Sequence, residues 1–181
     1  LGTAGKVSDK DVDANIIKRA ELTFLEGYLW DEGEPKTAFD KAILNSSKVA
    51  MSLSDLFCVE RHKAQFLELV KNKLDIIFAN EQEILSLIDS KSFDETVAFA
   101  KNLNKNVVIT RGEKGAVAVN NGEIIECSAK KKLNITDLTG AGDLFAAGYL
   151  HGVINHKSIK ESLEKGTELS AKIIQKIGAR I

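Results

Sequence analysis

The sequence predicts an α/β protein built in three layers, with a mainly parallel sheet and helices on both of its faces. Short, continuous apolar runs recur along the chain, as is typical of strands that are buried on both sides. Segments with helical spacing separate these runs, so consecutive strands are expected to lie parallel and to be joined by right-handed crossovers. A hairpin signal follows the last run and predicts an antiparallel pair.

The first part of the chain is expected to hold two helices with a strand between them. Ser8 followed by Asp11 is typical of a helix start, and apolar residues at helical spacing continue to Ala20. The apolar run 22–25 suits a buried strand. Pro35 fits the first position of the next helix, whose buried stripe contains Ala38, Phe39, Ala42 and Ile43.

The middle of the chain alternates between strands and helices. Each expected strand is a continuous apolar run, and each helix is indicated by capping residues and apolar spacing. The strands are expected at 49–53, 76–79 and 107–109. One helix is expected to end near residue 72, and two more are expected at 81–88 and 93–103.

The last part of the chain changes rhythm. The apolar stretches 116–119 and 123–127 flank Asn120-Asn121-Gly122, which is a strong hairpin signal. Two helices close the chain, one from 140 to about 155 and one from 158 to about 177.

Length, charge and cysteine content limit the class of protein. With 181 residues, the chain is predicted to form one domain that spans residues 1–181. Its net charge of −1 gives no footprint for nucleic acid, and its apolar stretches are too short to span a bilayer. Cys58 and Cys127 lie far apart and form no metal or redox motif, which favours a cytoplasmic setting. Nucleic acid and membrane are therefore not expected as partners.

A glycine-rich segment, 137–143, is the most informative stretch of the chain. Gly140, Ala141 and Gly142 precede good helix formers, so their N–H groups would lie at a helix N-terminus, which favours a phosphate. Asp143 follows, and a carboxylate beside a phosphate site is well placed to accept the proton of an attacking hydroxyl. The segment therefore indicates phosphoryl transfer. The alternative is an ordinary helix start, in which Asp143 only complements the helix dipole.

Two other glycine-rich phosphate motifs do not fit this segment. A Walker A loop needs Gly-Lys-Ser or Gly-Lys-Thr, and neither tripeptide occurs in the chain. A dinucleotide-binding fingerprint needs a third small residue at the position of Phe145. The preceding residues 130–134 also make a poor strand, so the strand–turn–helix context is absent.

Two further segments directly follow predicted strands, at the edge where parallel sheets bind ligands. Asn80 and Glu83 have the spacing of a capping box, which alone could explain them. Alternatively, they face the crevice and organise Mg²⁺ through its water shell. Thr110–Gly115 predicts a tight glycine turn into the next strand, and its functional interpretation is a backbone and hydroxyl surface for a nucleotide.

Together, the three segments resemble motifs of the ribokinase-like carbohydrate and nucleoside kinases, the PfkB family. Segment 137–143 resembles the family's C-terminal D-x-T-G-A-G-D signature, Asn80–Glu83 its N-x-x-E motif, and Thr110–Gly115 its T-x-G-x-x-G nucleotide motif. Their order and spacing agree, so the resemblance covers essentially the whole chain and implies a ribokinase-like fold.

The resemblance implies a role for each matching residue. Asp143 would be the catalytic base, and the amides of Gly140, Ala141 and Gly142 would form the anion hole for the transferred phosphoryl group. ATP and Mg²⁺ are the implied cofactors. The residues implied to bind the nucleotide are Thr110, Gly112, Gly115, Asn80, Thr167 and Ser170, and those implied to support the metal are Glu83 and Asn80.

Looser similarities extend over the rest of the chain. Residues 166–171 resemble the family's small-residue segment beside the adenine, and Gly178-Ala179 its terminal glycine motif. Asp137 and Thr139 match positions that help to hold a monovalent cation in some members, which makes such a cation a further candidate cofactor.

Within the family, residues 26–28 and 52–62 look most like bacterial adenosine-kinase-like members. This similarity implies a small-molecule acceptor, namely a nucleoside or sugar that is phosphorylated on a ribose 5′-hydroxyl or a comparable primary hydroxyl. A homo-oligomer is a possible assembly. The acceptor itself is not identified, because in this family it is read mainly by residues nearer the N-terminus.

The chain begins at Leu1 and has no counterpart of the family's early strands, lid sheet or diglycine motif. We therefore expect the C-terminal, nucleotide-binding and catalytic portion of a ribokinase-like kinase, with little or no activity by itself. The alternative is a non-catalytic nucleotide-binding fragment or module of the same fold. Retention of Asp143 argues against that alternative, since a protein without turnover has no chemical need for a base there.

Overall fold

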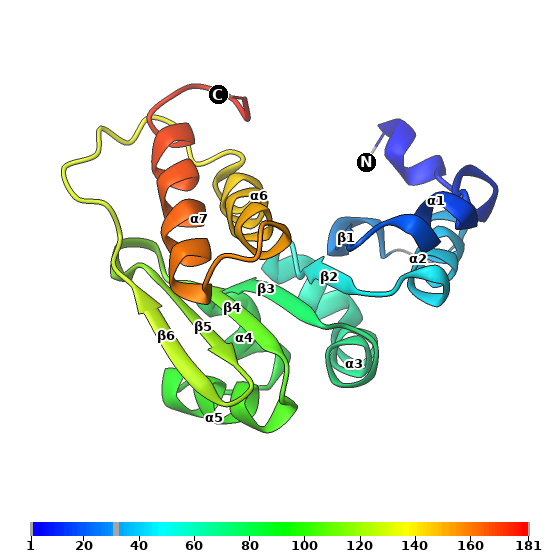
Figure 1. Ribbon diagram of the computed structural model, residues 1–181, viewed down its shortest axis with the longest axis horizontal. Coiled ribbons are helices and arrows are strands. Elements are labelled where there is room, and N and C mark those ends of the chain that lie inside the picture. Colours follow the sequence, from blue (N-terminus) through cyan, green and yellow to red (C-terminus); the bar gives the residue numbers. More distant parts are fainter. Residues whose placement is uncertain (1, 31–32, 181) are drawn as a thin grey trace.

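The computed structural model describes residues 2–30 and 33–180. Its centre is a six-stranded sheet whose strands follow one another in chain order (Figure 1). β1 to β4 run parallel, and β5 and β6 extend the sheet as an antiparallel pair, which confirms the predicted topology. The strands are β1 (Thr23–Glu26), β2 (Val49–Ser52), β3 (Ile76–Asn80), β4 (Asn106–Thr110), β5 (Ala116–Asn120) and β6 (Glu123–Cys127).

Helices cover both faces of this sheet. Residues of α2 to α5 pack on one face, and α6 and α7 pack on the other, so the predicted three layers are confirmed (Figure 1). The α-helices are α1 (Ala14–Arg19), α2 (Glu34–Asn45), α3 (Leu56–Asn72), α4 (Glu81–Leu87), α5 (Phe93–Leu103), α6 (Ala141–Ile154) and α7 (Ile159–Ile173). Short 3₁₀ helices are η1 (Gly2–Lys6), η2 (Asp9–Asp11), η3 (Gly27–Leu29) and η4 (Gly112–Lys114).

Alternate residues of the central strands enter two separate cores. Ile77 and Ile109 are buried on the face that carries α3 to α5, whereas Phe78 and Val108 are buried beneath α6. Phe78 meets Tyr149 of α6 edge to face, with ring centroids 5.4 Å apart. Burial on both faces explains why β3 and β4 are continuous apolar runs rather than alternating ones.

The predicted single helix from Ser8 is wrong. Ser8 caps only the short 3₁₀ helix η2, after which Val12 is extended with φ −97° and ψ 112°. Asp13 then starts α1 anew, because its carboxylate accepts hydrogen bonds from the amides of Asn15 and Ile16. The second capping residue divides the apolar pattern into two short elements.

Both ends of the chain also differ from expectation. Residues 2–6 form the 3₁₀ helix η1, ahead of the first element that the sequence predicted, whereas Leu1 lies outside the described residues. α7 ends well before Ile177, which is 86% exposed. The carbonyl of Ile174 accepts a 2.8 Å hydrogen bond from the Thr136 amide instead of continuing the helix. The segment after α7 is thus tied to the loop that precedes α6.

The predicted hairpin is confirmed at β5 and β6. Asn121 and Gly122 have φ values of 48° and 83°, and a type I′ turn requires positive φ at both positions. β6 is largely exposed, in contrast to the buried β5.

Two glycines let α6 and α7 approach each other closely. A Cβ atom on Gly148 would lie 2.7 Å from the carbonyl oxygen of Lys165, and one on Gly166 would lie 2.7 Å from that of Phe145. These distances leave no room for a side chain, so Gly148 and Gly166 serve helix packing.

The topology gathers the predicted site segments at one edge of the sheet. The parallel strands β1 to β4 all end there, and the turn after β4 belongs to the same edge. α6 runs in the opposite direction: Tyr149, in its second half, donates a 3.0 Å hydrogen bond to Asn106 at the start of β4. α6 therefore begins at the carboxyl edge, where ligands bind in such sheets.

Candidate functional site

The start of α6 is a helix N-terminus without a side-chain cap. Gly140 is the N-cap residue, lies in the left-handed region with φ 79°, and offers no side chain to the first-turn amides. The amide of Ala141 donates to the carbonyl of Leu138 at 3.1 Å. The amides of Gly142 and Asp143 have no acceptor within the described part of the chain. These two amides are therefore the open donors of the helix start.

The predicted anion hole of Gly140, Ala141 and Gly142 is only partly available in this conformation. The space beside Gly142 is open, because a Cβ atom there would have no neighbouring heavy atom within 4 Å. A Cβ atom on Gly140 would instead lie 3.1 Å from the Cβ of Ala179. Because the Ala141 amide already donates within the loop, its role and that of Gly140 stay predictions.

Asp137 fastens the glycine-rich segment to the end of the chain. One carboxylate oxygen accepts hydrogen bonds from the amide (2.9 Å) and hydroxyl (2.7 Å) of Thr139, and the other accepts from the Gly178 amide at 2.9 Å. These hydrogen bonds lower the pKa of Asp137, and the bond from the Gly178 amide contributes most. The similarity of Gly178-Ala179 to a family motif thus corresponds to a contact with this loop. The suggested monovalent cation at Asp137 and Thr139 stays a prediction.

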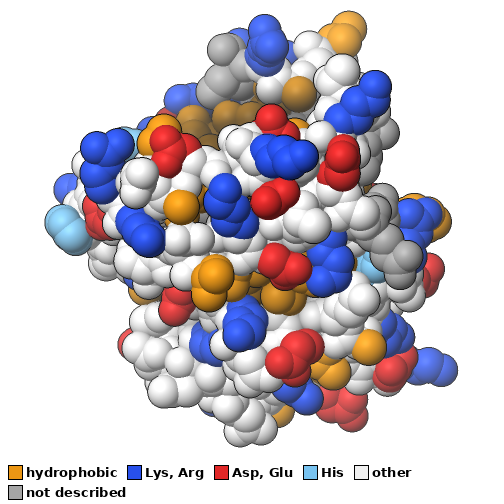
Figure 2. All heavy atoms as spheres, turned by 90° about the vertical axis from the view of Figure 1, so that its right-hand side faces the viewer, with side chains coloured by type: hydrophobic (Ala, Val, Ile, Leu, Met, Phe, Trp, Pro, Cys, Tyr) orange, Lys and Arg blue, Asp and Glu red, His pale blue; other side chains and the backbone are white. Residues whose placement is uncertain are grey.

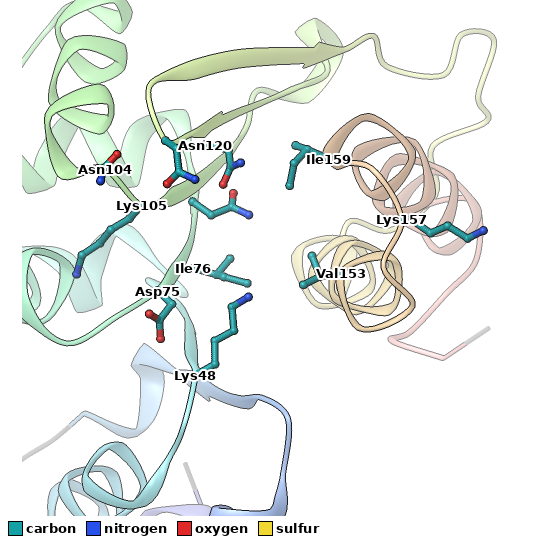
Figure 3. Close-up of a pocket in the computed structure, with 11 residues that line it drawn as sticks. Lys48, Asp75, Ile76, Asn104, Lys105, Asn120, Val153, Lys157 and Ile159 are labelled. Carbon is teal, nitrogen blue, oxygen red and sulfur yellow. The ribbon is translucent and has the colours of Figure 1, made fainter.

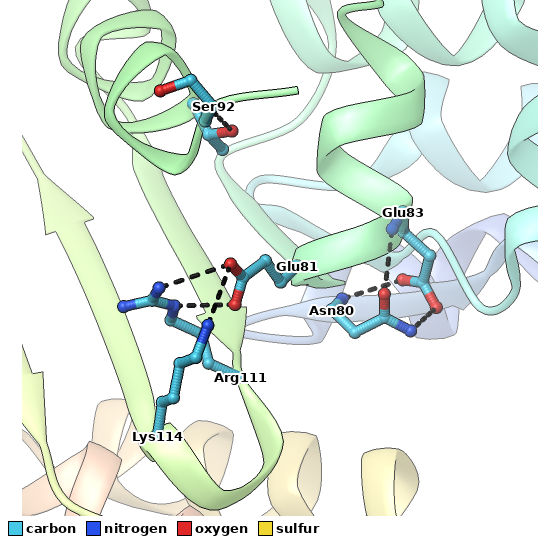
Figure 4. Close-up of polar contacts among 7 residues, drawn as sticks. Asn80, Glu81, Glu83, Ser92, Arg111 and Lys114 are labelled. Carbon is cyan, nitrogen blue, oxygen red and sulfur yellow. Dashed lines mark hydrogen bonds and ion pairs between the residues drawn. The ribbon is translucent and has the colours of Figure 1, made fainter. Parts of the chain in front are cut away.

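Asn80 and Glu83 form a complete capping box at the start of α4 (Figure 4). The Asn80 side-chain oxygen accepts from the Glu83 amide at 2.9 Å, and the Glu83 carboxylate accepts from the Asn80 amide at 3.0 Å. The Asn80 side-chain amide also donates to Glu83 Oε1 at 2.6 Å. The capping interpretation is therefore confirmed, and the metal role remains a prediction beside it.

Glu83 is buried and has a raised pKa, which is unusual for a capping residue. It is only 5% exposed. Burial, with a further contribution from the negative charge of Asp55, raises the pKa of Glu83 to about 7. A bound cation would relieve this cost of an ionised buried carboxylate, so the residue fits a metal-supporting role. The described residues contain no group of three or more histidine, cysteine or acidic side chains that could hold a metal ion.

The turn Thr110–Gly115 follows β4, next to the start of α4. Thr110 pairs with Asn80 across β4 and β3, so the two motifs are adjacent in the sheet. Gly115 has φ 90°, and a Cβ atom there would lie 2.0 Å from the carbonyl oxygen of Cys127. Gly112 has φ 55° with open space around it. Gly115 is thus required by the turn itself, whereas the surroundings of Gly112 leave room for a ligand.

Thr167 and Ser170, predicted to lie near the adenine, have different surroundings. Thr167 is buried, and its hydroxyl donates to the sulfur of Cys127 at 3.6 Å. Ser170 is half-buried. The Thr167 hydroxyl is therefore engaged inside the fold, and the nucleotide role of both residues stays a prediction.

Two residues that the sequence reasoning did not assign to the site lie at the end of β1. Partial burial, and next the charge of Asp143, raise the pKa of Glu26. The pKa of Tyr28 is raised by burial and then by several negative charges, among them Glu83 and Asp143. Charges at the starts of both α4 and α6 thus contribute to the raised pKa of Tyr28, in agreement with the position of both helix starts at the carboxyl edge of the sheet. Glu26 could have been assigned to the site from the sequence, because it directly follows a predicted parallel strand.

A separate cavity of about 310 Å³ lies at the opposite edge of the sheet. Its lining comes from the amino ends of β3 and β4, the end of α6 and the start of α7. In Figure 3, Lys48 points toward Ile76 and Val153, whereas Lys157 points away from them. The lysines do not converge, so this cavity is a weaker candidate for an anion than the start of α6.

The surface shows no large area of one charge in the view of Figure 2. Basic and acidic side chains alternate over the face at the α1 and α2 end of the molecule, with hydrophobic side chains between them. In the part of the chain that the structure describes, no helix is long and apolar enough to cross a membrane.

Comparisons with known proteins agree with this geometry. The sequence matches the pfkB family carbohydrate kinases over residues 3–181. A crystal structure of adenosine kinase from Sinorhizobium meliloti superposes with a TM-score of 0.94 and 35% identity over 98% of this chain and 56% of its own. The cytidine kinase of Thermococcus kodakarensis is 31% identical over 139 residues, which are 75% of this chain and 50% of that protein. A ribokinase II from E. coli, solved with ATP and Mg²⁺, has a TM-score of 0.85 at 20% identity and shows the fold alone.

The chain spans about half the length of the cytidine kinase and of the adenosine kinase that it matches. Within that span, the family match covers almost every residue, including the three motifs at the carboxyl edge. The chain therefore belongs to the pfkB family of carbohydrate kinases.

Proposed function

We propose that this chain is the nucleotide-binding and catalytic part of an ATP-dependent phosphotransferase that acts on a primary hydroxyl of a sugar or nucleoside. The observation that carries the proposal is the open start of α6. The amides of Gly142 and Asp143, which have no acceptor among the described residues, lie at the positive end of a helix, and the exposed Asp143 carboxylate lies beside them. Donors for an anion and an acceptor for a proton are the two requirements of hydroxyl phosphorylation.

Asp143 is proposed as the base that takes the proton of the acceptor hydroxyl as that oxygen attacks the terminal phosphorus. Its exposure supports this role, since a substrate can reach it. The Gly142 amide, with those of Gly140 and Ala141 once the Leu138 bond is released, would stabilise the charge on the transferred phosphoryl group. Among the described residues, no heavy atom lies within 4 Å of a Cβ atom placed on Gly142, which supports access of a phosphate to this amide.

The nucleotide is proposed to lie between the turn Thr110–Gly115 and α7, with its phosphates directed at the start of α6. Gly112 leaves open space on that turn, and Ser170 remains accessible on α7. Asn80 and Glu83 would hold Mg²⁺ through its water shell. When bound, Mg²⁺ neutralises negative charge on the phosphates.

A nucleoside such as adenosine is proposed as the acceptor. The adenosine kinase and the cytidine kinase that resemble this chain act on nucleosides by their names. Glu26 and Tyr28, which lie near Asp143, supply polar groups at the place where an acceptor hydroxyl would arrive.

Glycine at position 27, between these two residues, is required by packing, since a Cβ atom there would lie 2.8 Å from the Leu53 carbonyl oxygen.

The second candidate function is a non-catalytic nucleotide-binding module. Two measurements separate the candidates: calorimetric titration of the 181-residue chain with Mg-ATP, and ADP release by the gene product that carries this chain, given a panel of nucleosides and sugars. The kinase proposal expects nucleotide binding by the chain and ADP release that depends on one class of acceptor. Binding without turnover for any acceptor would favour the module, and absence of nucleotide binding would contradict both.

Self-association of the chain is proposed as well. β1 is an outer strand of the sheet and its residues are only half-buried, and unpaired strand edges favour association. Light scattering on the purified chain is expected to give a mass above that of one copy. A monomer at all accessible concentrations would contradict this expectation.

A further inference from the structure

An ion pair connects the turn Thr110–Gly115 to the start of α4 (Figure 4). Arg111 Nε donates to Glu81 Oε2 at 2.9 Å, and Arg111 Nη2 donates to Glu81 Oε1 at 3.3 Å. Both side chains are mostly buried, with exposed fractions of 18% and 24%. This two-point contact fixes the orientation of the guanidinium as well as its position.

Arg111 is held from a second direction by α5. Its guanidinium carbon lies 3.5 Å from the centroid of the Phe93 ring, which is a close cation–π contact. The hydrogen bonds from Arg111 are also the main reason why the pKa of Glu81 is lowered. Held by both contacts, the arginine has little freedom left to lose when a ligand binds beside it.

The two partners belong to different site segments. Glu81 is the first residue of α4 and stands between Asn80 and Glu83, while Arg111 follows Thr110 in the nucleotide turn. The strand pairing of Asn80 with Thr110 is the last register pair of β3 and β4. Beyond that pair the turn leaves the sheet, and Gly112 has open space around it. The Glu81–Arg111 pair thus joins the turn to α4 at the point where sheet pairing stops.

We infer that Glu81 and Arg111 are positioning residues, which hold the nucleotide turn in register with Asn80 and Glu83 so that one nucleotide can contact both segments. This inference rests on the proposed function. The physical reason is preorganisation: a turn that is already fixed loses less conformational freedom on binding than a mobile one. Neither residue needs to contact the nucleotide itself.

The test is calorimetric titration of the 181-residue chain with Mg-ADP, with thermal unfolding measured on every variant. Arg111→Lys keeps the positive charge but loses the two-point hydrogen bonding to Glu81 and the stacking on Phe93. Glu81→Gln keeps the shape of the side chain but loses its negative charge. Each variant is expected to bind Mg-ADP about 10-fold more weakly, the equivalent of one charged hydrogen bond. The double variant is expected to fall well short of the roughly 100-fold loss that independent effects would give, because both single variants lose the Arg111–Glu81 contact, while Glu81→Gln also loses a 3.7 Å ion pair with Lys114.

Lys63→Gln is the matched control. Lys63, in α3, forms a 2.5 Å ion pair with Asp89, which follows the far end of α4, so the variant tests an ion pair beside this helix but away from the turn. Its Mg-ADP affinity is expected to stay within about 2-fold of the parent, because additivity holds for distant sites.

The outcomes separate the two claims. If the parent binds Mg-ADP and both variants keep its affinity while their unfolding temperatures fall, the pair is only a structural brace and the positioning role is wrong. An affinity loss in Lys63→Gln as large as that in Arg111→Lys would contradict it equally. If the parent binds no nucleotide, the proposed function fails and the positioning role fails with it.

Discussion

Two helices begin at the carboxyl edge of the sheet, and their first turns are built in opposite ways. α4 starts with a complete capping box, in which Asn80 and Glu83 satisfy each other and Glu83 is buried. α6 starts with Gly140 and no side-chain cap, so the amides of Gly142 and Asp143 are open and the Asp143 carboxylate is exposed. A filled helix start supports its surroundings, whereas an open one can accept an anion.

This difference indicates how the carboxyl edge of the sheet can offer one site to a phosphate and another to a metal ion. The dipole of α6 is available to a ligand because no side chain of the described residues caps the first turn of this helix. At α4 the amide of Glu83, which corresponds to that of Asp143, is already bonded to the Asn80 side chain, and the Glu83 carboxylate is buried and would gain from a cation. The proposed phosphate and metal roles follow from this division, and the predictions below test each half.

The largest effect is expected from Asp143→Asn. The amide keeps the shape of the side chain but cannot accept the hydroxyl proton, and loss of a general base typically costs about 10²–10⁴-fold in turnover. Acceptor-dependent ADP release by the gene product that carries this chain measures the loss, while Mg-ATP affinity is expected to stay similar. If the variant kept most of its kcat, Asp143 would only complement the helix dipole.

Gly142→Val is expected to lower kcat/KM for ATP by about 10- to 100-fold, because the branched side chain would fill the approach to the open amides. Folding is expected to survive, since a Cβ atom at Gly142 has no neighbour within 4 Å. Steady-state kinetics at varied ATP concentration measure the effect, with thermal unfolding as a check.

Gly148→Ala, on the same helix, is the contrasting variant. Its Cβ atom would lie 2.7 Å from the Lys165 carbonyl oxygen, so a loss of about 1–3 kcal/mol in unfolding free energy is expected from overpacking. Its ATP kinetics, measured well below the unfolding temperature, are expected to stay near those of the parent. Ordinary kinetics in Gly142→Val would remove the open start of α6 as the anion site.

Glu83→Gln tests the start of α4 through the pH dependence of stability. The pKa of Glu83 is raised from 4.5 to about 7, so the folded chain binds a proton between these values that the unfolded chain has released. Stability therefore falls as pH rises across this window, and the cost of ionised Glu83 is fully present above pH 7. Glutamine can keep one of the two hydrogen bonds that the carboxylate accepts from Asn80, and it removes this pH dependence.

Urea unfolding of the parent and Glu83→Gln at pH 5 and pH 8 measures the difference. The parent is expected to lose about 1–3 kcal/mol more than the variant between the two pH values. Added Mg²⁺ is expected to raise the unfolding temperature of the parent at pH 8 and to leave that of the variant unchanged. Equal pH dependence in both proteins would mean that Glu83 is already ionised at pH 5 and is only a cap.

Much of the fold could be predicted because its signals are local. Continuous apolar runs at 76–79 and 107–109 reflect burial on two faces, and the turn at Asn121-Gly122 has the positive φ values of a type I′ turn. The division of the first predicted helix could have been read from Asp13, a second capping residue within one apolar pattern. The early end of α7 could not, because it depends on the Thr136 amide from a distant loop.

The site could be predicted in its motifs but not in its contacts. Spacing alone does not tell that Glu83 is buried, that the Thr167 hydroxyl points to Cys127, or that the Ala141 amide is engaged. These properties depend on what the fold places around each group. The pair between Glu81 and Arg111 was hidden for the same reason, since its partners are distant in sequence.

The most direct test of the central claim is a titration of the ¹⁵N-labelled 181-residue chain with Mg-ADP, followed by two-dimensional NMR. The open start of α6 predicts that the amide signals of Gly142 and Asp143 move the most, and that Gly142→Val abolishes these shifts. Shifts confined to the residues around the cavity at Lys48, with Gly142 and Asp143 unmoved, would contradict the account.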